Sequence, residues 1–97
     1  MSYNKSDYLD LVRYNARLAG YTEEIHESDK PEKKFYIITP DNKKIYFGAS
    51  GYKDFLIYLL TEGIDVALKK RENYRKRHRN DPRSKYSAGQ LAREILW

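Results

Sequence analysis

The highest density of chemically active side chains in the sequence lies between residues 69 and 79. Seven of these eleven residues are Lys or Arg, and one, Glu72, is acidic. Charges of one sign at this density repel one another, so a counter-charge is expected. Phosphate is the commonest source of such a counter-charge, because Arg binds it bidentately and Lys binds it as a point charge. The segment therefore predicts contact with nucleic acid; an acidic protein surface, an anionic membrane surface and a solvated helix face are the alternatives.

Helical spacing divides this basic segment into two kinds of position. One face continues an apolar stripe and holds Leu68, Arg71, Tyr74 and His78. We expect Tyr74 to pack inward on that face, with the aliphatic stem of Arg71 beside it. The other cations are the candidate contacts to nucleic acid or to an acidic partner: Lys69, Lys70, Arg75, Lys76, Arg77 and Arg79.

Ten tyrosines are the second unusual feature of the chain. Aromatic rings among basic residues can stack on single-stranded bases. Packing positions are available, however, for Tyr8, Tyr52, Tyr58 and Tyr74. Tyr36 and Tyr46 are expected to stack across a hairpin. Because tyrosine is also favoured at protein–protein interfaces, we predict a partner interface at Tyr36, Tyr46 and Trp97.

Signals for catalysis are sparse. No serine or threonine has an obvious base beside it, and Asp54 with His78 is the one catalytic pair that can be imagined. The acidic residues around His26 could form a metal cluster, but strand alternation favours a solvated edge. The loop 48–51 precedes a helix, yet it lacks the lysine and spacing of a phosphate-binding loop, so a strand-to-helix turn is expected. We predict a non-enzymatic protein without cofactor, catalytic residues or metal ligands.

Composition and charge set the class of protein. A chain of 97 residues is one domain at most, spanning 1–97. The net charge is +5, but residues 1–63 hold nine basic and ten acidic residues, whereas residues 64–97 hold ten and four. The positive excess therefore belongs to the last third. The absence of cysteine excludes disulfides and thiolate metal sites. No stretch approaches the roughly 20 apolar residues of a membrane span, and the first residues lack the apolar region of a signal peptide.

Four segments must position these side chains. The sequence predicts an N-terminal helix over 1–20, a β-meander over 21–48, a helical part over 52–79 and a C-terminal helix over 87–97. The expected fold is α+β, with a small antiparallel meander of two or three strands packed by three or four short helices.

Local signals support these boundaries. Ser6 is the expected cap of the first helix and Gly20 its end. Alternation over 34–47 around the turn at 40–42 predicts a hairpin. A helix is expected from about Tyr52, another from residue 64 to about 79, and a last one capped by Ser87. Its apolar face predicts docking on this domain or on a neighbouring chain.

Three sequence blocks carry a resemblance to a known family. They are Phe47-Gly48-Ala49-x-Gly51-Tyr52-x-Asp54-Phe55, then Tyr74-x-x-Arg77-His78, then Ser87-Ala88-Gly89 with Leu96-Trp97. In this order, over about residues 34–97, the chain resembles small basic proteins of largely unknown function encoded by large double-stranded DNA viruses and some phages. The resemblance implies a viral gene product associated with the virion, and it supplies no catalytic residues.

These observations lead to a functional expectation. We expect a viral structural protein, a minor capsid or internal virion component, whose basic helix meets nucleic acid or an acidic capsid surface. The alternative is a nucleic-acid-binding protein that acts in DNA packaging or regulation in the infected cell. The expected partners are virion proteins, nucleic acid and a second copy of the chain. The expected location is the virion, and the host cytoplasm or nucleus during assembly.

Overall fold

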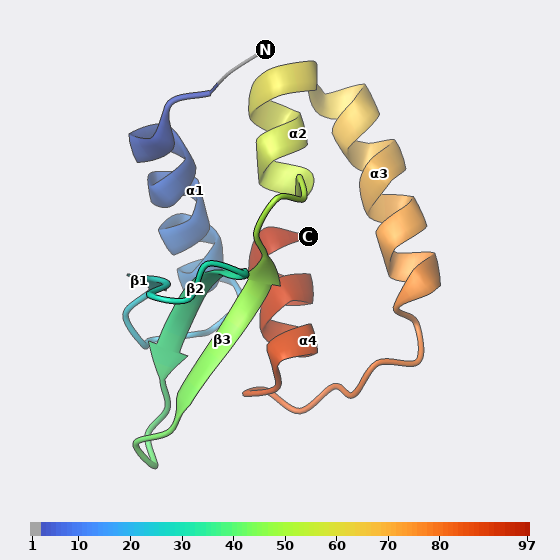
Figure 1. The fold of residues 1–97 in the computed structure, drawn as a ribbon. Helices are drawn as coiled ribbons and strands as arrows, with labels where there is room; N and C mark the ends of the chain where they lie inside the picture. Colours follow the sequence, from blue (N-terminus) through green and yellow to red (C-terminus); the bar gives the residue numbers. More distant parts are fainter. Residues whose placement is uncertain (1–2) are drawn as a thin grey trace.

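The computed structural model describes residues 3–97 and confirms the α+β class. A three-stranded antiparallel sheet in the order β1-β2-β3 packs with four α-helices and one π-helical turn. In chain order the elements are α1 (Lys5–Leu18), β1 (His26–Glu27), β2 (Lys33–Ile38), β3 (Lys44–Ala49), α2 (Phe55–Glu62), α3 (Ile64–Arg77), α4 (Ala88–Leu91) and the π-helical turn η1 (Ala92–Leu96). In Figure 1 the C-terminal helix lies between the sheet and α3, and α2 and α3 form a helical hairpin above it.

The N-terminal helix forms as predicted, but its cap differs. Asn4, not Ser6, is the N-cap, and its side chain accepts from the backbone amides of Ser6 and Asp7. At the other end Gly20 has φ +92°, and the amides of Gly20 and Tyr21 donate to the carbonyls of Arg17 and Ala16. The end of the helix at Gly20 is therefore confirmed, and the hydrogen bonds there are those of a Schellman motif.

The hairpin between β2 and β3 is confirmed with its register. Phe35 pairs with Phe47 on the buried face, and Tyr36 pairs with Tyr46 on the outer face. The turn holds Asn42 at φ +66°, the left-handed conformation that asparagine tolerates. The first part of the predicted meander, residues 21–28, forms a much shorter strand than an unbroken meander from residue 21 requires, since only His26 and Glu27 pair with β2.

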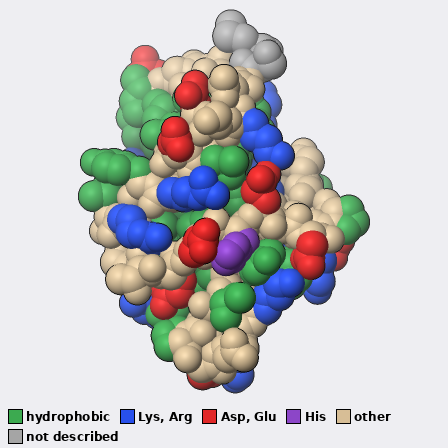
Figure 2. Space-filling view, turned by 90° about the vertical axis from the view of Figure 1, so that its left-hand side faces the viewer, with side chains coloured by type: hydrophobic (Ala, Val, Ile, Leu, Met, Phe, Trp, Pro, Cys, Tyr) green, Lys and Arg blue, Asp and Glu red, His purple; other side chains and the backbone are tan. Residues whose placement is uncertain are grey.

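The outer face of the sheet carries the predicted aromatic pair. The ring centroids of Tyr36 and Tyr46 lie 5.4 Å apart, and His26 stacks on Tyr36 at 4.9 Å. The ammonium of Lys44 lies over both tyrosine rings, and Asp29 accepts from the Tyr46 hydroxyl at 2.6 Å. Charges of both signs are interspersed over the molecular face that carries α1 and β1 (Figure 2).

The helical hairpin differs from expectation at both ends. Helix α2 begins at Phe55 rather than Tyr52, because the side chain of Asp54 caps it by accepting from the Ile57 amide at 2.9 Å. Helix α3 ends at Arg77, two residues before Arg79. Its inward face is narrower than the spacing indicated. Ala67 and Tyr74 are buried, whereas Leu68, which was assigned to this face, is exposed, and so is Ile64 in the first turn of the helix.

The C-terminal segment fills the centre of the core. Ser87 caps α4 by accepting from the Gln90 amide, as predicted. Three side chains of α4 and η1 are almost completely buried, Leu91, Ile95 and Leu96. Gly48 of β3 has φ +80°, and a Cβ there would lie 2.8 Å from Leu96 Cδ1. The glycine therefore permits the close approach of the C-terminal segment to the sheet. The prediction that this apolar segment docks is confirmed for its own domain.

Candidate nucleic-acid interface

All six cations predicted as contacts are exposed on or just beyond α3. They are Lys69, Lys70, Arg75, Lys76, Arg77 and Arg79. Within residues 3–97 one of them, Lys76, has a carboxylate partner, Glu72 one helical turn earlier at 3.3 Å. Cations in the last turn of α3 also lie at the negative end of the helix dipole, which stabilises the helix that presents them. The structure thus presents the cations on a regular helix.

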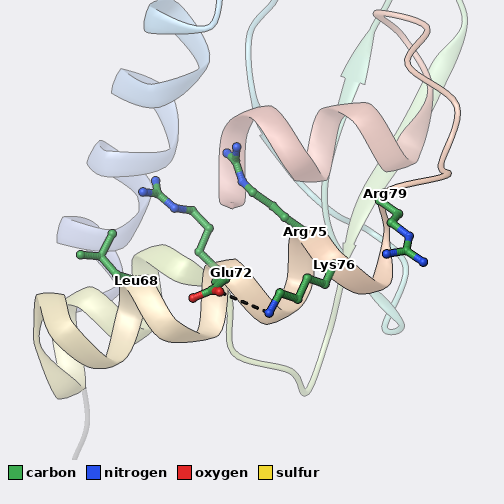
Figure 3. Close-up of a pocket in the computed structure, with 6 residues that line it drawn as sticks. Leu68, Glu72, Arg75, Lys76 and Arg79 are labelled. Atoms are coloured by element: carbon green, nitrogen blue, oxygen red, sulfur yellow. Dashed lines mark ion pairs between the residues drawn. The ribbon is translucent and has the colours of Figure 1, made fainter.

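One side of α3 is an open basic groove (Figure 3). Its lining residues all belong to one segment, Leu68, Arg71, Glu72, Arg75, Lys76 and Arg79. The guanidinium carbon of Arg71 lies 4.5 Å from the centroid of the Phe55 ring, a cation–π contact between α3 and α2. Arg75 reaches toward the C-terminal helix, where Nη2 donates to the main-chain oxygen of Trp97 at 3.4 Å. Because one helix supplies every wall, this groove is an accessible surface rather than an enclosed site.

The neighbouring side of α3 borders a deeper cavity of about 550 Å³. Lys70 and Arg77 line it from α3, Gly48 and Ala49 from β3, and Trp97 from the end of the chain. The six predicted cations therefore do not form one surface. Lys70 and Arg77 face the cavity, Arg75, Lys76 and Arg79 face the open groove, and Lys69 lines neither.

Stacked rings form one wall of this cavity. Tyr74 is buried between Trp97, whose ring lies 4.3 Å away at an interplanar angle of 5°, and His78 at 4.2 Å and 26°. His78 Nδ1 and Asp81 Oδ2 are 2.7 Å apart, which fixes the imidazole at the outer end of the stack. Tyr58 of α2 extends this wall, with its centroid 6.4 Å from that of Trp97. The inward packing predicted for Tyr74 is confirmed.

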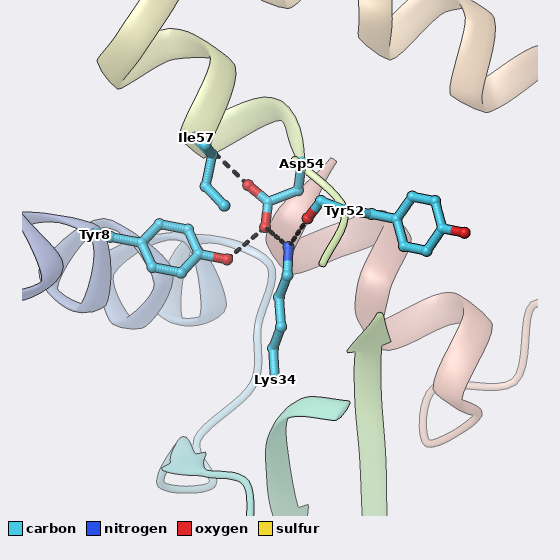
Figure 4. Close-up of polar contacts among 5 residues, drawn as sticks. All are labelled: Tyr8, Lys34, Tyr52, Asp54 and Ile57. Atoms are coloured by element: carbon cyan, nitrogen blue, oxygen red, sulfur yellow. Dashed lines mark hydrogen bonds and ion pairs between the residues drawn. The ribbon is translucent and has the colours of Figure 1, made fainter. Parts of the chain in front are cut away.

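Another part of the cavity lining belongs to a buried polar cluster (Figure 4). The Asp54 carboxylate is 1% exposed, accepts from the Tyr8 hydroxyl, and pairs with Lys34 Nζ at 3.0 Å. Lys34 Nζ also donates to the Tyr52 carbonyl at 2.6 Å. Burial, followed by the charge of Asp54, holds the pKa of Tyr8 well above its usual value. Every partner of Asp54 is therefore structural, and the cluster fixes the loop 50–54 at the rim of the cavity.

Several expectations about single residues change. Asp54 and His78 both line the cavity, but each is satisfied elsewhere, Asp54 by Lys34 and His78 by Asp81, so they form no catalytic pair. Tyr52 is 74% exposed and does not pack. Trp97 stacks on Tyr74 of its own chain, whereas Tyr36 and Tyr46 lie on the outer face of the sheet. Their role as a partner interface stays a prediction.

Sequence reasoning missed three lysines of the cavity, Lys33, Lys34 and Lys53. Lys33 and Lys34 belong to β2 and Lys53 to the loop before α2, so no local spacing connects them with α3. Alternation along β2 predicts that the neighbouring Lys33 and Lys34 lie on opposite faces of the strand, so no signal in the sequence indicated that both line this cavity.

Within residues 3–97 no group of three or more His, Asp or Glu side chains could hold a metal ion. None of the helices described there is long and apolar enough to cross a bilayer.

Comparison with known protein families gives a match to part of the chain. The model of a family of unknown function, DUF5754, matches residues 23–57. This segment runs from just before β1 to the first turn of α2, and it includes Lys34, Gly48 and Asp54. No curated protein matches the chain, and no solved structure matches it either. The chain is therefore similar, over this third of its length, to a family that carries no assigned function.

Proposed function

We propose that this is a non-enzymatic nucleic-acid-binding protein and that α3 is its contact surface. The observation that supports the proposal most strongly is the exposure of all six cations of residues 69–79, with one carboxylate partner among them in residues 3–97. Unpaired cations on a folded helix gain free energy when they approach phosphates, because bound counterions are released from the nucleic acid.

The proposal predicts a strong dependence on salt. If four to seven phosphates are contacted, the logarithm of the binding constant should fall against the logarithm of salt concentration with a slope of about −4 to −6. An acidic protein partner would also be salt-sensitive, so the nature of the polyanion must be tested directly.

The sequence resemblance adds a biological setting to this proposal. We place the protein in a virus particle as a minor capsid or internal component, with α3 on packaged nucleic acid or on an acidic capsid surface. The second setting is the infected cell, in DNA packaging or regulation. Mass spectrometry of purified particles separates the two, since absence from mature particles favours the second.

The binding test is a fluorescence anisotropy titration with labelled DNA over a series of NaCl concentrations. The variant replaces Lys69, Lys70, Lys76 and Arg77 by Glu, and it should lose binding while keeping its far-UV circular dichroism spectrum and cooperative unfolding. The matched control reverses four exposed lysines outside α3, Lys5, Lys30, Lys43 and Lys85. It carries the same change in net charge and should retain most of the affinity.

Two results would overturn the assignment. Equal loss of affinity in both variants would show that net charge, not α3, determines binding. Tighter binding to a poly-glutamate peptide than to DNA of equal charge would favour an acidic protein partner.

A further inference from the structure

We propose that the cavity beside α3 holds nucleotide units of a single-stranded nucleic acid. Bases would lie against Tyr52 and Trp97, and phosphates against Lys33, Lys70 and Arg77. This inference rests on the proposed function, because it identifies the form of nucleic acid that α3 binds. It depends on three further observations: exposed rings at the cavity, uncompensated cations in its walls, and its dimensions.

The first observation concerns the rings of Tyr52 and Trp97. Tyr52 is 74% exposed, and its ring extends away from the Asp54 cluster that holds its backbone (Figure 4). The loop therefore fixes the backbone of Tyr52 while its side chain contributes no packing to the fold. Trp97 is only partly buried, with Tyr74 stacked on its ring and the cavity beside it. Rings of this kind are stacking surfaces for unpaired bases, which all have a π-face.

The second observation concerns charge. Two of the cations that line the cavity are already paired, Lys34 with Asp54 and Lys53 with Glu62 at 3.0 Å. Lys33, Lys70 and Arg77 line the same space, and no carboxylate in residues 3–97 lies within ion-pair distance of them. Phosphates would supply the missing negative charge, and the Arg77 guanidinium can bind one bidentately.

The third observation concerns size. The cavity of about 550 Å³ lies in the range of small-ligand sites, so it can enclose a nucleotide unit but is too small to enclose a duplex. Bases in a duplex are stacked and paired, and only unstacked bases can reach a ring inside a pocket. The combination of rings, free cations and this volume therefore favours a single strand.

The experiment uses the intrinsic fluorescence of Trp97, the one tryptophan of the chain. The full-length protein is titrated with a twelve-nucleotide poly-dT strand, a twelve-base-pair duplex and heparin, each also followed by anisotropy or competition. We expect the single strand to quench Trp97, and the duplex and heparin to bind with little quenching.

Two pairs of variants locate the site. Tyr52→Ala should weaken binding of the single strand about 5- to 100-fold, and Tyr14→Ala, which removes a ring 63% exposed on α1, should not change it. The double variant Lys70→Gln, Arg77→Gln should abolish quenching. Lys69→Gln with Lys76→Gln removes the same charge outside the cavity and should lower affinity while quenching at saturation persists.

The outcomes distinguish this inference from the proposed function. If no polyanion binds with salt dependence, the proposed function fails. If all three polyanions bind and quench Trp97 equally, or if Tyr52→Ala binds the single strand as tightly as the unmodified chain, the cavity is not a nucleotide site, although α3 remains a polyanion surface.

Discussion

The rings of Tyr74 and Trp97 lie parallel, 4.3 Å apart, although 22 residues separate them in sequence. This contact joins α3 to the end of the C-terminal segment, and the other large attachment of α3 is its packing on α2. Arg75 reinforces the junction by donating to the main-chain oxygen of Trp97. The helix that carries the cations is thus held in place by an aromatic stack at the edge of the cavity.

Replacement of Trp97 by Ala should therefore destabilise the protein. The loss combines partly buried aromatic area with the stacking contribution, so we expect about 1.5–3 kcal/mol of unfolding free energy. Trp97→Phe keeps a ring on Tyr74 and should cost less than half as much. Urea unfolding followed by circular dichroism measures both. Equal stability of Trp97→Ala and the unmodified chain would show that the stack does not hold α3.

Gly48 and Gly51 offer a matched pair of tests for the close approach of the C-terminal segment. Both have positive φ, +80° and +85°, but an added Cβ would meet Leu96 only at Gly48. Gly51→Ala should cost about 1–2 kcal/mol from backbone strain alone. Gly48→Ala carries the same strain plus the displacement of Leu96, so we expect about 2–4 kcal/mol. Chemical denaturation of both variants is the measurement, and equal losses would contradict a packing role for Gly48.

The fold was predictable where local sequence determines it. Alternation around Phe35 and Phe47 fixed the hairpin register, and Gly20 marked the end of α1. Errors arose where a tertiary partner decides. Helix α2 begins three residues later than predicted, because the Asp54 carboxylate caps it while it also binds Tyr8 and Lys34. Leu68 is exposed because α3 packs on α2 along a strip narrower than a full apolar face.

The candidate site was predictable only in part. The density of charge in residues 69–79 identified α3, and helical spacing identified Tyr74 as its inward aromatic residue. The division of the cations between two surfaces could not be predicted from the sequence, because the cavity that Lys70 and Arg77 face forms only when β3 and Trp97 are in place. The exposure of Tyr52 likewise follows from the loop geometry that Lys34 imposes on its carbonyl.

Removal of Lys34 tests the buried ion pair. Lys34→Met leaves the Asp54 carboxylate buried with no cation beside it, so we expect a loss of about 3–5 kcal/mol. Lys76→Met breaks the exposed pair with Glu72 and should cost less than about 0.5 kcal/mol. The double variant Lys34→Met, Asp54→Asn should recover part of the loss, because no uncompensated charge then remains in the core. Thermal and urea unfolding give the comparison, and a Lys34→Met variant as stable as Lys76→Met would rule out the buried pair as a structural element.

Two buried tyrosines predict that stability falls at alkaline pH. Burial and then the charge of Asp54 raise the pKa of Tyr8 well above its usual value, and burial raises the pKa of Tyr21 to about 12. The folded state therefore keeps phenol protons that the unfolded chain releases above about pH 10. Their contribution is fully present below pH 10 and is lost as the pH rises from 10 toward 12, by up to about 1.4 kcal/mol per pH unit for each tyrosine.

The measurement is urea unfolding at intervals from pH 8 to 11.5, followed by circular dichroism. Tyr74, whose pKa is raised mainly by burial, and Lys5 and Lys44, whose pKa values are raised mainly by hydrogen bonds at the surface, add smaller declines in the same direction. Tyr8→Phe should be less stable at pH 8, because Asp54 loses a donor, yet its stability should fall less steeply above pH 10 than that of the unmodified chain. Tyr14→Phe is the control, since its ring is exposed in the folded chain, and its slope should be unchanged. Burial against a carboxylate is the reason to expect a Tyr8 phenol that keeps its proton in the fold. An identical slope in Tyr8→Phe and the unmodified chain would contradict this and would show that Tyr8 does not cause the loss of stability at alkaline pH.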